Sequence, residues 1–319
     1  MQKHDLADYV RILARGKNAS RHMTMEEAHF TMSNMLQGNY RPEQLGAIFM
    51  LMRVLEESEQ EIAGFAQAIA EQLPDLSDTD LLWPSYAGKR RQPFWCLLSA
   101  LLLSSMGYRI LFHGTEAHTA ERVYLHQIFS HFDLPILENT SQIGQQPLAY
   151  LPVASIHPEL QQWLLLKSVL GVRSPINSVL KTIATPGVAS VQGVFHPNYQ
   201  GLHCGAARLA GHDALVIKGE GGEFEVNPER RCRAQYCFNG NDGEIIIDND
   251  RSLFDDKPAD IGFQPLQDFW RGELISEYAL QAVTRTAALA LCSIKRSSDY
   301  SAALKECLSA WQQRDTTRL

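Results

Sequence analysis

The chain lacks a long hydrophobic segment. No run approaches the roughly 18 consecutive apolar residues that a membrane-spanning helix needs. Residues 1–5 are polar, whereas a secretory signal would continue into an apolar stretch. We therefore expect a cytoplasmic protein with no membrane partner.

Cysteine is scarce, and the sequence contains no Cys-x-x-Cys pair. The six cysteines are scattered along the chain, which argues against a zinc site and gives no disulfide framework. We expect them to be core or surface thiols. Repeats and low-complexity tracts are also missing. No serine or cysteine beside His113, His157 or His196 forms a recognisable nucleophile motif, so no catalytic residue is assigned.

Positive charge is in deficit overall but is unevenly distributed. The net charge is −7, which speaks against a surface covered with basic residues. Residues 84–131 nevertheless carry five lysines and arginines against two acids, whereas residues 219–260 carry eleven acids against five cations. We expect a polarised surface with any polyanion site confined to one face. Three acids in the second segment, Glu220, Glu223 and Glu225, are close in sequence, but such loops are usually solvated, so neither a metal nor another cofactor is predicted.

The first 75 residues have the pattern of four helices. Thr24 and Ser58 each begin a capping box, with a glutamate three residues later, and Pro42 can open the helix between them. Apolar residues at helical spacing run through residues 6–13, 43–55 and 62–73. Most of these residues should be core, and the surplus favours a homodimer through these helices.

From residue 81 onward short apolar strands alternate with helices. Strands are expected at residues 81–83, 108–112, 148–153, 190–195 and 214–217, and helices at 96–106 and 120–132. This alternation predicts an α/β domain with a mostly parallel central sheet. Residues 159–184 interrupt it with a helical pattern that should cross back to the first helices. Residues 220–260 resemble loops with a strand at 244–248, and two helices, 276–294 and 300–313, close the chain.

The predicted organisation is therefore a small N-terminal α-helical domain, residues 1–75, followed by a larger α/β domain, residues 76–319. The crossover at about 159–184 is expected to pack on the helical domain.

A basic loop lies between the first strand and a wholly apolar helix. It contains Lys89, Arg90 and Arg91 after Tyr86, and Phe94 and Trp95 follow. A strand, a loop and a helix N-terminus form the frame of a phosphate site, but such loops are usually glycine-rich and this one has a single glycine. We expect its side chains to attract polyanions. The alternative is a solvated basic turn.

Several fragments, in order along the chain, resemble the anthranilate phosphoribosyltransferase family. The longest runs without a gap from His157-Pro158 through Lys167, Leu170-Gly171-Val172-Arg173-Ser174 and Asn177 to Pro186. The other five are Gln44-Leu45-Gly46-Ala47, Ala63-Gly64-Phe65, His113-Gly114, Gly193-Val194-Phe195-His196-Pro197 and Ala214-Leu215-Val216-Ile217-Lys218-Gly219. The resemblance covers nearly the whole chain. It implies a small helical domain joined to an α/β domain in a dimer.

Four departures from that family bear on activity. Residues 86–91 stand where the enzymes have a Gly-Thr-Gly-Gly-Asp loop for the diphosphate, and Phe112 stands where they have a lysine before His-Gly. Glu223-Phe224 replaces their Asp-Glu pair for magnesium, and Lys167 replaces an arginine that contacts anthranilate. The combination is similar to the YbiB-type paralogues of the family, which implies dimers that bind nucleic acid and lack the parent activity.

We therefore predict sequence-independent nucleic-acid binding, with single-stranded DNA as the expected ligand. The residues expected to contact it are Lys89, Arg90 and Arg91 of the loop, Arg15, Lys17 and Arg21 of the helical domain, Lys167, Arg173 and Lys181 of the crossover, and Tyr86. Phe94 and Trp95 could also stack on bases. Two structural interpretations remain as alternatives. Trp95 could be a core residue, and Arg173 could tether the crossover by a salt bridge. Two other functions remain open, a magnesium-dependent phosphoribosyl- or glycosyl-transferase with an altered substrate, and an inert structural partner.

Overall fold

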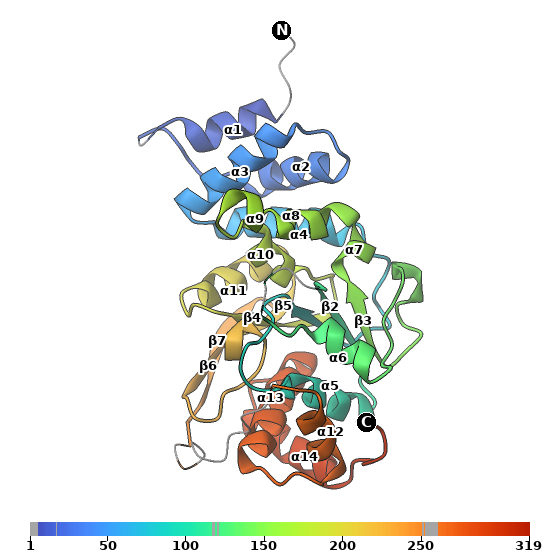
Figure 1. Ribbon diagram of the computed structural model, residues 1–319. Helices are drawn as coiled ribbons and strands as arrows, with labels where there is room; N and C mark the ends of the chain where they lie inside the picture. Colours follow the sequence, from blue (N-terminus) through green and yellow to red (C-terminus); the bar gives the residue numbers. More distant parts are fainter. Residues whose placement is uncertain (1–5, 17, 117–118, 120, 251, 253–260) are drawn as a thin grey trace.

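The computed structural model describes residues 6–16, 18–116, 119, 121–250, 252 and 261–319. Four helices come first, as the capping boxes predict: α1 (Ala7–Ala14), α2 (Met25–Leu36), α3 (Pro42–Leu55) and α4 (Glu59–Ala70). Both boxes form, since the hydroxyls of Thr24 and Ser58 accept from the backbone N–H of Glu27 and Glu61. These helices lie at one end of the molecule, where Figure 1 shows them in blue.

A seven-stranded sheet forms the centre. Its strands are β1 (Leu81–Ser85), β2 (Ile110–Gly114), β3 (Leu148–Pro152), β4 (Ala189–Val194), β5 (Asp213–Lys218), β6 (Cys232–Phe238) and β7 (Asn241–Ile247). Their order is β3-β2-β1-β4-β5-β6-β7. The first five are parallel, and β6 and β7 add an antiparallel edge. The mostly parallel sheet of the prediction is confirmed, but β6 was not foreseen.

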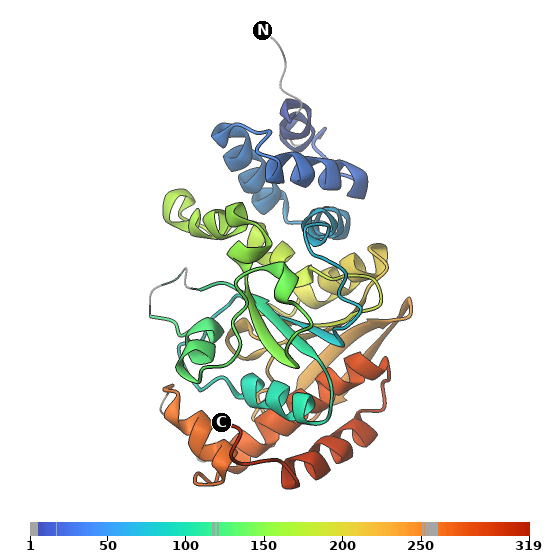
Figure 2. The ribbon, with the colours of Figure 1, turned by 90° about the vertical axis from the view of Figure 1, so that its right-hand side faces the viewer.

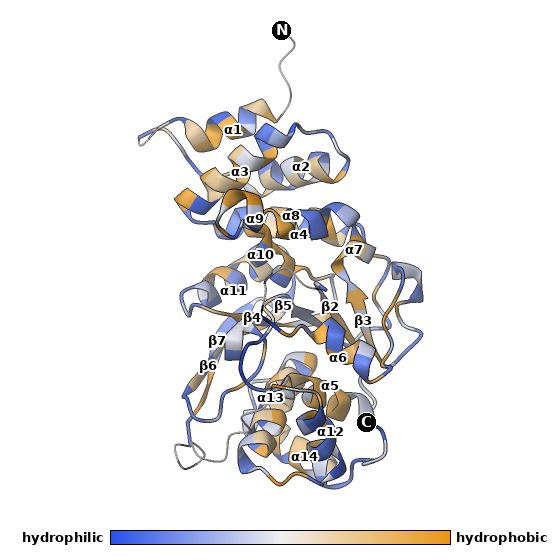
Figure 3. Ribbon diagram, viewed as in Figure 1, coloured by the Kyte–Doolittle hydropathy of each residue, from blue (hydrophilic) through white to orange (hydrophobic). Residues whose placement is uncertain are grey.

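Helices cover both faces of the sheet (Figures 1 and 2). Inward-pointing residues alternate along each strand, so Leu81 and Trp83 face one core while Leu82 faces the other. The first core packs on α5 (Trp95–Ser105), α6 (Leu125–His131), α12 (Gln264–Arg271), α13 (Glu277–Lys295) and α14 (Tyr300–Gln312). Figure 3 shows α5 as hydrophobic, in keeping with its burial on every side.

The crossover packs on the N-terminal helices. It consists of α7 (Val153–Ile156), α8 (Pro158–Leu165), α9 (Lys167–Leu170), α10 (Ile176–Val179) and the 3-10 turn Leu180–Thr182. The rings of Phe49 and Trp163 meet edge to face at 5.9 Å, which joins α3 to α8. These segments share one hydrophobic core with α1 to α4. The division at residue 75 stays a prediction.

The remaining short elements are α11 (Tyr199–Leu209) and the 3-10 turns Thr140–Gln142 and Glu220–Gly222. One expected helix is shorter than predicted, and one helix was not predicted. Residues 121–124 are not helical, so α6 begins at Leu125, and Ala120 lies outside the described residues. Helix α12 was missed. Within the described part of the chain no helix is long and apolar enough to span a membrane.

All six cysteines are buried, which settles the choice between core and surface thiols.

Candidate functional site

The site lies between β1 and β4, where the order in which strands are added to the sheet changes direction. The connection after β1 leads to β2 on one side, and the connection after β4 leads to β5 on the other. In parallel sheets, ligands bind in the crevice at the carboxyl ends of the strands at such a point. Here the crevice is bordered by the basic loop, residues 86–94, and by the segments that follow β4 and β5.

Glu223 binds the backbone of the basic loop. Its Oε1 accepts hydrogen bonds from the backbone N–H groups of Ala87 and Gly88, both at 2.8 Å, and the side chain is buried. In a phosphate-binding loop such paired N–H donors would face an anionic ligand. In this chain a carboxylate from the loop after β5 already satisfies them.

Arg122 binds the same two residues from the other side. Its Nη1 donates to the carbonyl oxygens of Ala87 and Gly88 at 2.9 and 2.8 Å. Backbone bonds of 2.9 Å in both directions between Lys89 and Val123 extend this contact. Gly88 has φ of 65°, and a Cβ at that residue would lie 2.9 Å from the ring of Tyr124. The loop is therefore fixed, and glycine is required at residue 88.

Lys89 points into the protein, contrary to the prediction of a phosphate contact on the surface. Its side chain is 1% exposed, and Nζ lies 2.5 Å from Glu225 Oε1 and donates to the Pro93 carbonyl at 2.6 Å. Glu225 Oε2 accepts from the backbone N–H of Cys96, in the first turn of α5. Burial raises the pKa of Glu225, although the lysine opposes that rise. A second carboxylate thus occupies a helix N-terminus that could have faced a phosphate.

The aromatic side chains of the loop are also inside. Tyr86 is buried and its hydroxyl is hydrogen-bonded to His113 Nδ1 at 2.8 Å. Burial lowers the pKa of His113 to about 3, so its ring is neutral at physiological pH. Phe94 and Trp95 are core residues. The expectation that Tyr86, Phe94 and Trp95 stack on bases is wrong, because each ring is already packed, and the core interpretation of Trp95 is confirmed.

The other predicted cations differ in their availability. Arg90 and Arg91 are exposed at the tip of the loop, and Arg90 lies 3.8 Å from Glu121 in an exposed pair. Figure 3 shows this loop as a hydrophilic segment. On the N-terminal helices Arg15 is exposed, whereas Arg21 makes a two-pronged pair with Glu27 at 2.6 and 2.7 Å. Lys17 lies outside the described residues.

Arg173 and Lys181 lie together in a cleft of about 460 Å³ between the N-terminal helices and the sheet. Lys181 donates to the carbonyls of Gly193 and Gly222 at 2.6 and 2.9 Å, and burial lowers its pKa to about 8. Arg173 is half-buried. Among the described residues no ion pair includes it, and its role as a tether of the crossover stays an alternative interpretation. Lys167 begins α9 and is half-buried outside this cleft.

Three residues of the cleft were missed from the sequence. Arg53 Nη1 donates to the hydroxyl of Tyr199 at 3.3 Å, and that hydroxyl donates to Glu57 at 3.2 Å. Tyr199 is more than 140 residues from both partners. No local pattern could have signalled this chain of contacts.

The residues present do not fit a magnesium diphosphate as the parent enzymes would hold it. Glu223 is committed to Ala87 and Gly88. Phe224, which the resemblance to the enzymes aligns with their second carboxylate, packs against Trp83 with ring centroids 5.4 Å apart. A diphosphate needs backbone donors and metal-binding carboxylates together. In this crevice the backbone donors of Ala87 and Gly88 are already bonded, and the described residues contain no cluster of side chains that could hold a metal ion.

The chain is similar in sequence and in fold to known proteins. The helical bundle domain of the glycosyl transferase family matches residues 7–73. YbiB of Escherichia coli (strain K12) is 27% identical over 71% of this chain and 74% of its own. Anthranilate phosphoribosyltransferase of Clavibacter sepedonicus is 26% identical over 63% of this chain and 60% of its own. The solved anthranilate phosphoribosyltransferase of Thermus thermophilus matches with a TM-score of 0.72 and 18% identity, over 97% of this chain and 96% of that one.

The fold and the crevice define a two-part, phosphoribosyltransferase-like α/β protein. The chain belongs to the anthranilate phosphoribosyltransferase-like family, which includes YbiB-type members.

Proposed function

We propose that this protein binds nucleic acid in the cytoplasm without sequence preference, chiefly as single strands, and has lost the transferase reaction. The observation that carries the second part is the pair of 2.8 Å bonds from Ala87 and Gly88 to Glu223. An internal carboxylate that satisfies these donors removes the cradle for a diphosphate and repels one electrostatically.

The first part is supported by the cations that remain accessible. Arg90 and Arg91 extend from the fixed loop, and Arg173 opens into the neighbouring cleft. A protein of net charge −7 repels nucleic acid at long range, so binding depends on a local cluster within a Debye length of about 8 Å. Contacts to phosphates carry no sequence information, which is why we propose binding without sequence preference.

The test is a titration of labelled single-stranded and duplex oligonucleotides of unrelated sequence at two salt concentrations. We expect similar affinities for all single strands and a marked loss of affinity at the higher salt, because phosphate contacts release counterions. Absence of binding at low salt, or strong preference for one sequence, contradicts the proposal.

We also propose that the protein is a homodimer through its helical part. Four exposed apolar side chains, Val54, Leu165, Val169 and Val172, lie on α3 and on the packed segment from α8 to residue 172. Figure 3 shows hydrophobic colour on α9 and at the adjacent end of α3. Exposed apolar groups of this kind favour a protein interface.

The second candidate is a transferase with an altered substrate. The cleft supports it, because Arg173 and Lys181 could still hold an anionic ligand there. Calorimetric titration with phosphoribosyl pyrophosphate and magnesium separates the two. Binding in the micromolar range, or release of pyrophosphate in the presence of anthranilate, favours the transferase and contradicts our first proposal.

A further inference from the structure

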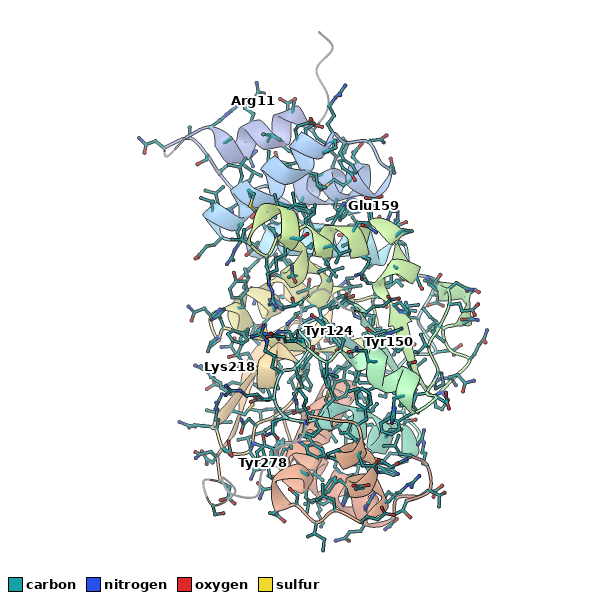
Figure 4. The ribbon with its side chains drawn as sticks, viewed as in Figure 1. Arg11, Tyr124, Tyr150, Glu159, Lys218 and Tyr278 are labelled. Atoms are coloured by element: carbon teal, nitrogen blue, oxygen red, sulfur yellow. The ribbon has the colours of Figure 1, made fainter. Side chains whose placement is uncertain are left out.

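A second hollow lies on the other side of the segment that follows β4. Its volume is about 500 Å³, and four exposed cations line it: Lys218, Arg230, Arg231 and Arg233. We call it the β5–β6 groove. Figure 4 shows Lys218 at the edge of the molecule, at the end of β5. The three arginines belong to residues 219–260, the segment with an excess of acids. The net charge of that segment therefore does not reveal this local cluster of positive charge.

Two of the four cations have no ion-pair partner among the residues that the structure describes. Within the described residues no ion pair involves Lys218 or Arg230, whereas Arg233 pairs with Glu244 and Arg231 lies 3.5 Å from Asp248. Both of these pairs are exposed, and exposed pairs contribute little free energy. One acid, Glu220, also lines the groove, and Asn227 donates to it. The groove is therefore net positive.

The register of the sheet places two of these cations side by side. Ile217 of β5 is paired with Ala234 of β6 in antiparallel fashion, so the next position brings Lys218 beside Arg233. Like charges that face each other across a sheet are destabilising. An anionic ligand would relieve this repulsion.

The groove and the cleft meet at one exposed segment, residues 195–198. Pro197 and Asn198 line both hollows. Phe195, at the start of this segment, is 55% exposed, and the edge-to-face ring of His196 lies 5.0 Å away. Phe195 itself lines the cleft, beside Arg173 and Lys181. A large aromatic side chain that is exposed to water next to cations has the arrangement of a stacking platform for a base.

We propose that a single strand of nucleic acid crosses residues 195–198, with a base stacked on Phe195 and backbone phosphates on Lys218 and Arg230. This inference rests on the proposed function and specifies the path and the form of its ligand. A single strand is required because the bases of a duplex are stacked on one another and offer no free face to Phe195. The cleft, with Arg53, Arg173 and Lys181, receives the strand on the other side.

Fluorescence anisotropy with labelled homothymidine strands and a duplex tests the path. The variants are Phe195→Ala, Phe195→Trp and the double variant Lys218→Ala with Arg230→Ala. Lys305→Ala serves as control, since Lys305 is exposed on α14, on the face of the sheet remote from residues 195–198 (Figure 1).

Phe195→Ala should weaken single-strand binding roughly 5- to 150-fold, the range that loss of one base–aromatic stack gives, without changing the salt slope. Phe195→Trp should retain affinity, and duplex binding should be indifferent to both changes. The double variant should flatten the slope of log K against log salt by about 1.4 per subunit, since each phosphate on a single strand contributes about 0.7. Lys305→Ala should behave as the wild type.

The outcomes separate the path from the function. If the wild type binds strands and all these variants bind equally well, the path is wrong and the proposed function stands. If Phe195→Ala weakens duplex and single strand alike, the stacking role is overturned. If the wild type binds no oligonucleotide, both proposals fail. Unfolding curves of each variant exclude loss of structure as the cause.

Discussion

Lys89 Nζ lies 2.5 Å from Glu225 Oε1 in the interior of the protein. The two residues are 136 positions apart, and both side chains are inaccessible to solvent. This pair removes from the surface the first of three consecutive cations. It also joins the basic loop to the segment after β5, on which both Glu223 and Glu225 are carried.

Removal of one partner of this pair should destabilise the protein strongly. We expect Lys89→Ala to lower the free energy of unfolding by about 3–5 kcal/mol, because Glu225 would be left buried without a counter-charge. Arg90→Ala, one residue on and exposed, should change it by less than about 0.5 kcal/mol. Urea denaturation measures both. Equal stability of the two variants would mean that the buried pair does not form.

Removal of Glu223 should open an anion site. Glu223→Ala leaves the N–H groups of Ala87 and Gly88 without their acceptor and should cost about 1–3 kcal/mol of stability. Arg122 and Lys181 remain nearby: burial lowers the pKa of both, and the charge of Glu223 opposes that shift. Pyrophosphate should therefore raise the unfolding temperature of this variant but leave the wild type unchanged. A similar rise in both proteins would show that Glu223 does not occupy the site.

The exposed loop arginines should determine the salt dependence of binding. Two arginines in each of two subunits give four phosphate contacts, so Arg90→Ala with Arg91→Ala should flatten the salt slope by about 2.8 on single strands. All sequences should weaken alike, because these contacts are to phosphates. Oligonucleotide titration at several salt concentrations measures the change. An unaltered slope means that the loop is only a solvated turn.

The apolar surface of the helical part should hold the dimer together. Light scattering of the wild type should give about twice 35.8 kDa. Val169→Glu should yield the monomer, because a charge buried in an interface without a partner is strongly unfavourable. Ile275→Glu is the matched control, since Ile275 is also highly exposed but lies before α13. A wild-type monomer, or a dimer that survives Val169→Glu, contradicts this interface.

Two buried histidines should make the protein acid-sensitive. Burial lowers the pKa of His113 and of His203 to about 3, from the ordinary 6.5 that they regain on unfolding. Between these pH values the unfolded chain binds more protons than the folded one. Stability is therefore fully present above pH 6.5 and is lost as the pH falls towards 3, by up to about 1.4 kcal/mol per pH unit for each histidine.

His203→Gln should reduce this loss by up to half. Exposed His196→Gln is the matched control for the substitution itself. Denaturation at a series of pH values gives the slopes. A variant of His203 with the full slope would show that its ring is not kept neutral in the folded protein.

Local sequence signals determined much of the fold. The capping boxes at Thr24 and Ser58 and the proline at residue 42 placed α2, α3 and α4, because caps act within a few residues. Alternation of apolar strands and helices predicted the parallel sheet, because this pattern can also be read from neighbouring residues. Helix α12 escaped because it is short, and β6 because its burial is irregular.

The candidate site depended on contacts that only the tertiary structure creates. A run of Lys, Arg and Arg in the sequence cannot show that Lys89 turns inward, since the acid that holds it is supplied by a distant segment. The same holds for Glu223, whose role arises because the loops after β1 and β5 end at one edge of the sheet. The fold likewise brings Arg230 and Phe195 to one surface. The sequence determines which side chains are present, whereas the order of the strands decides which of them share a surface.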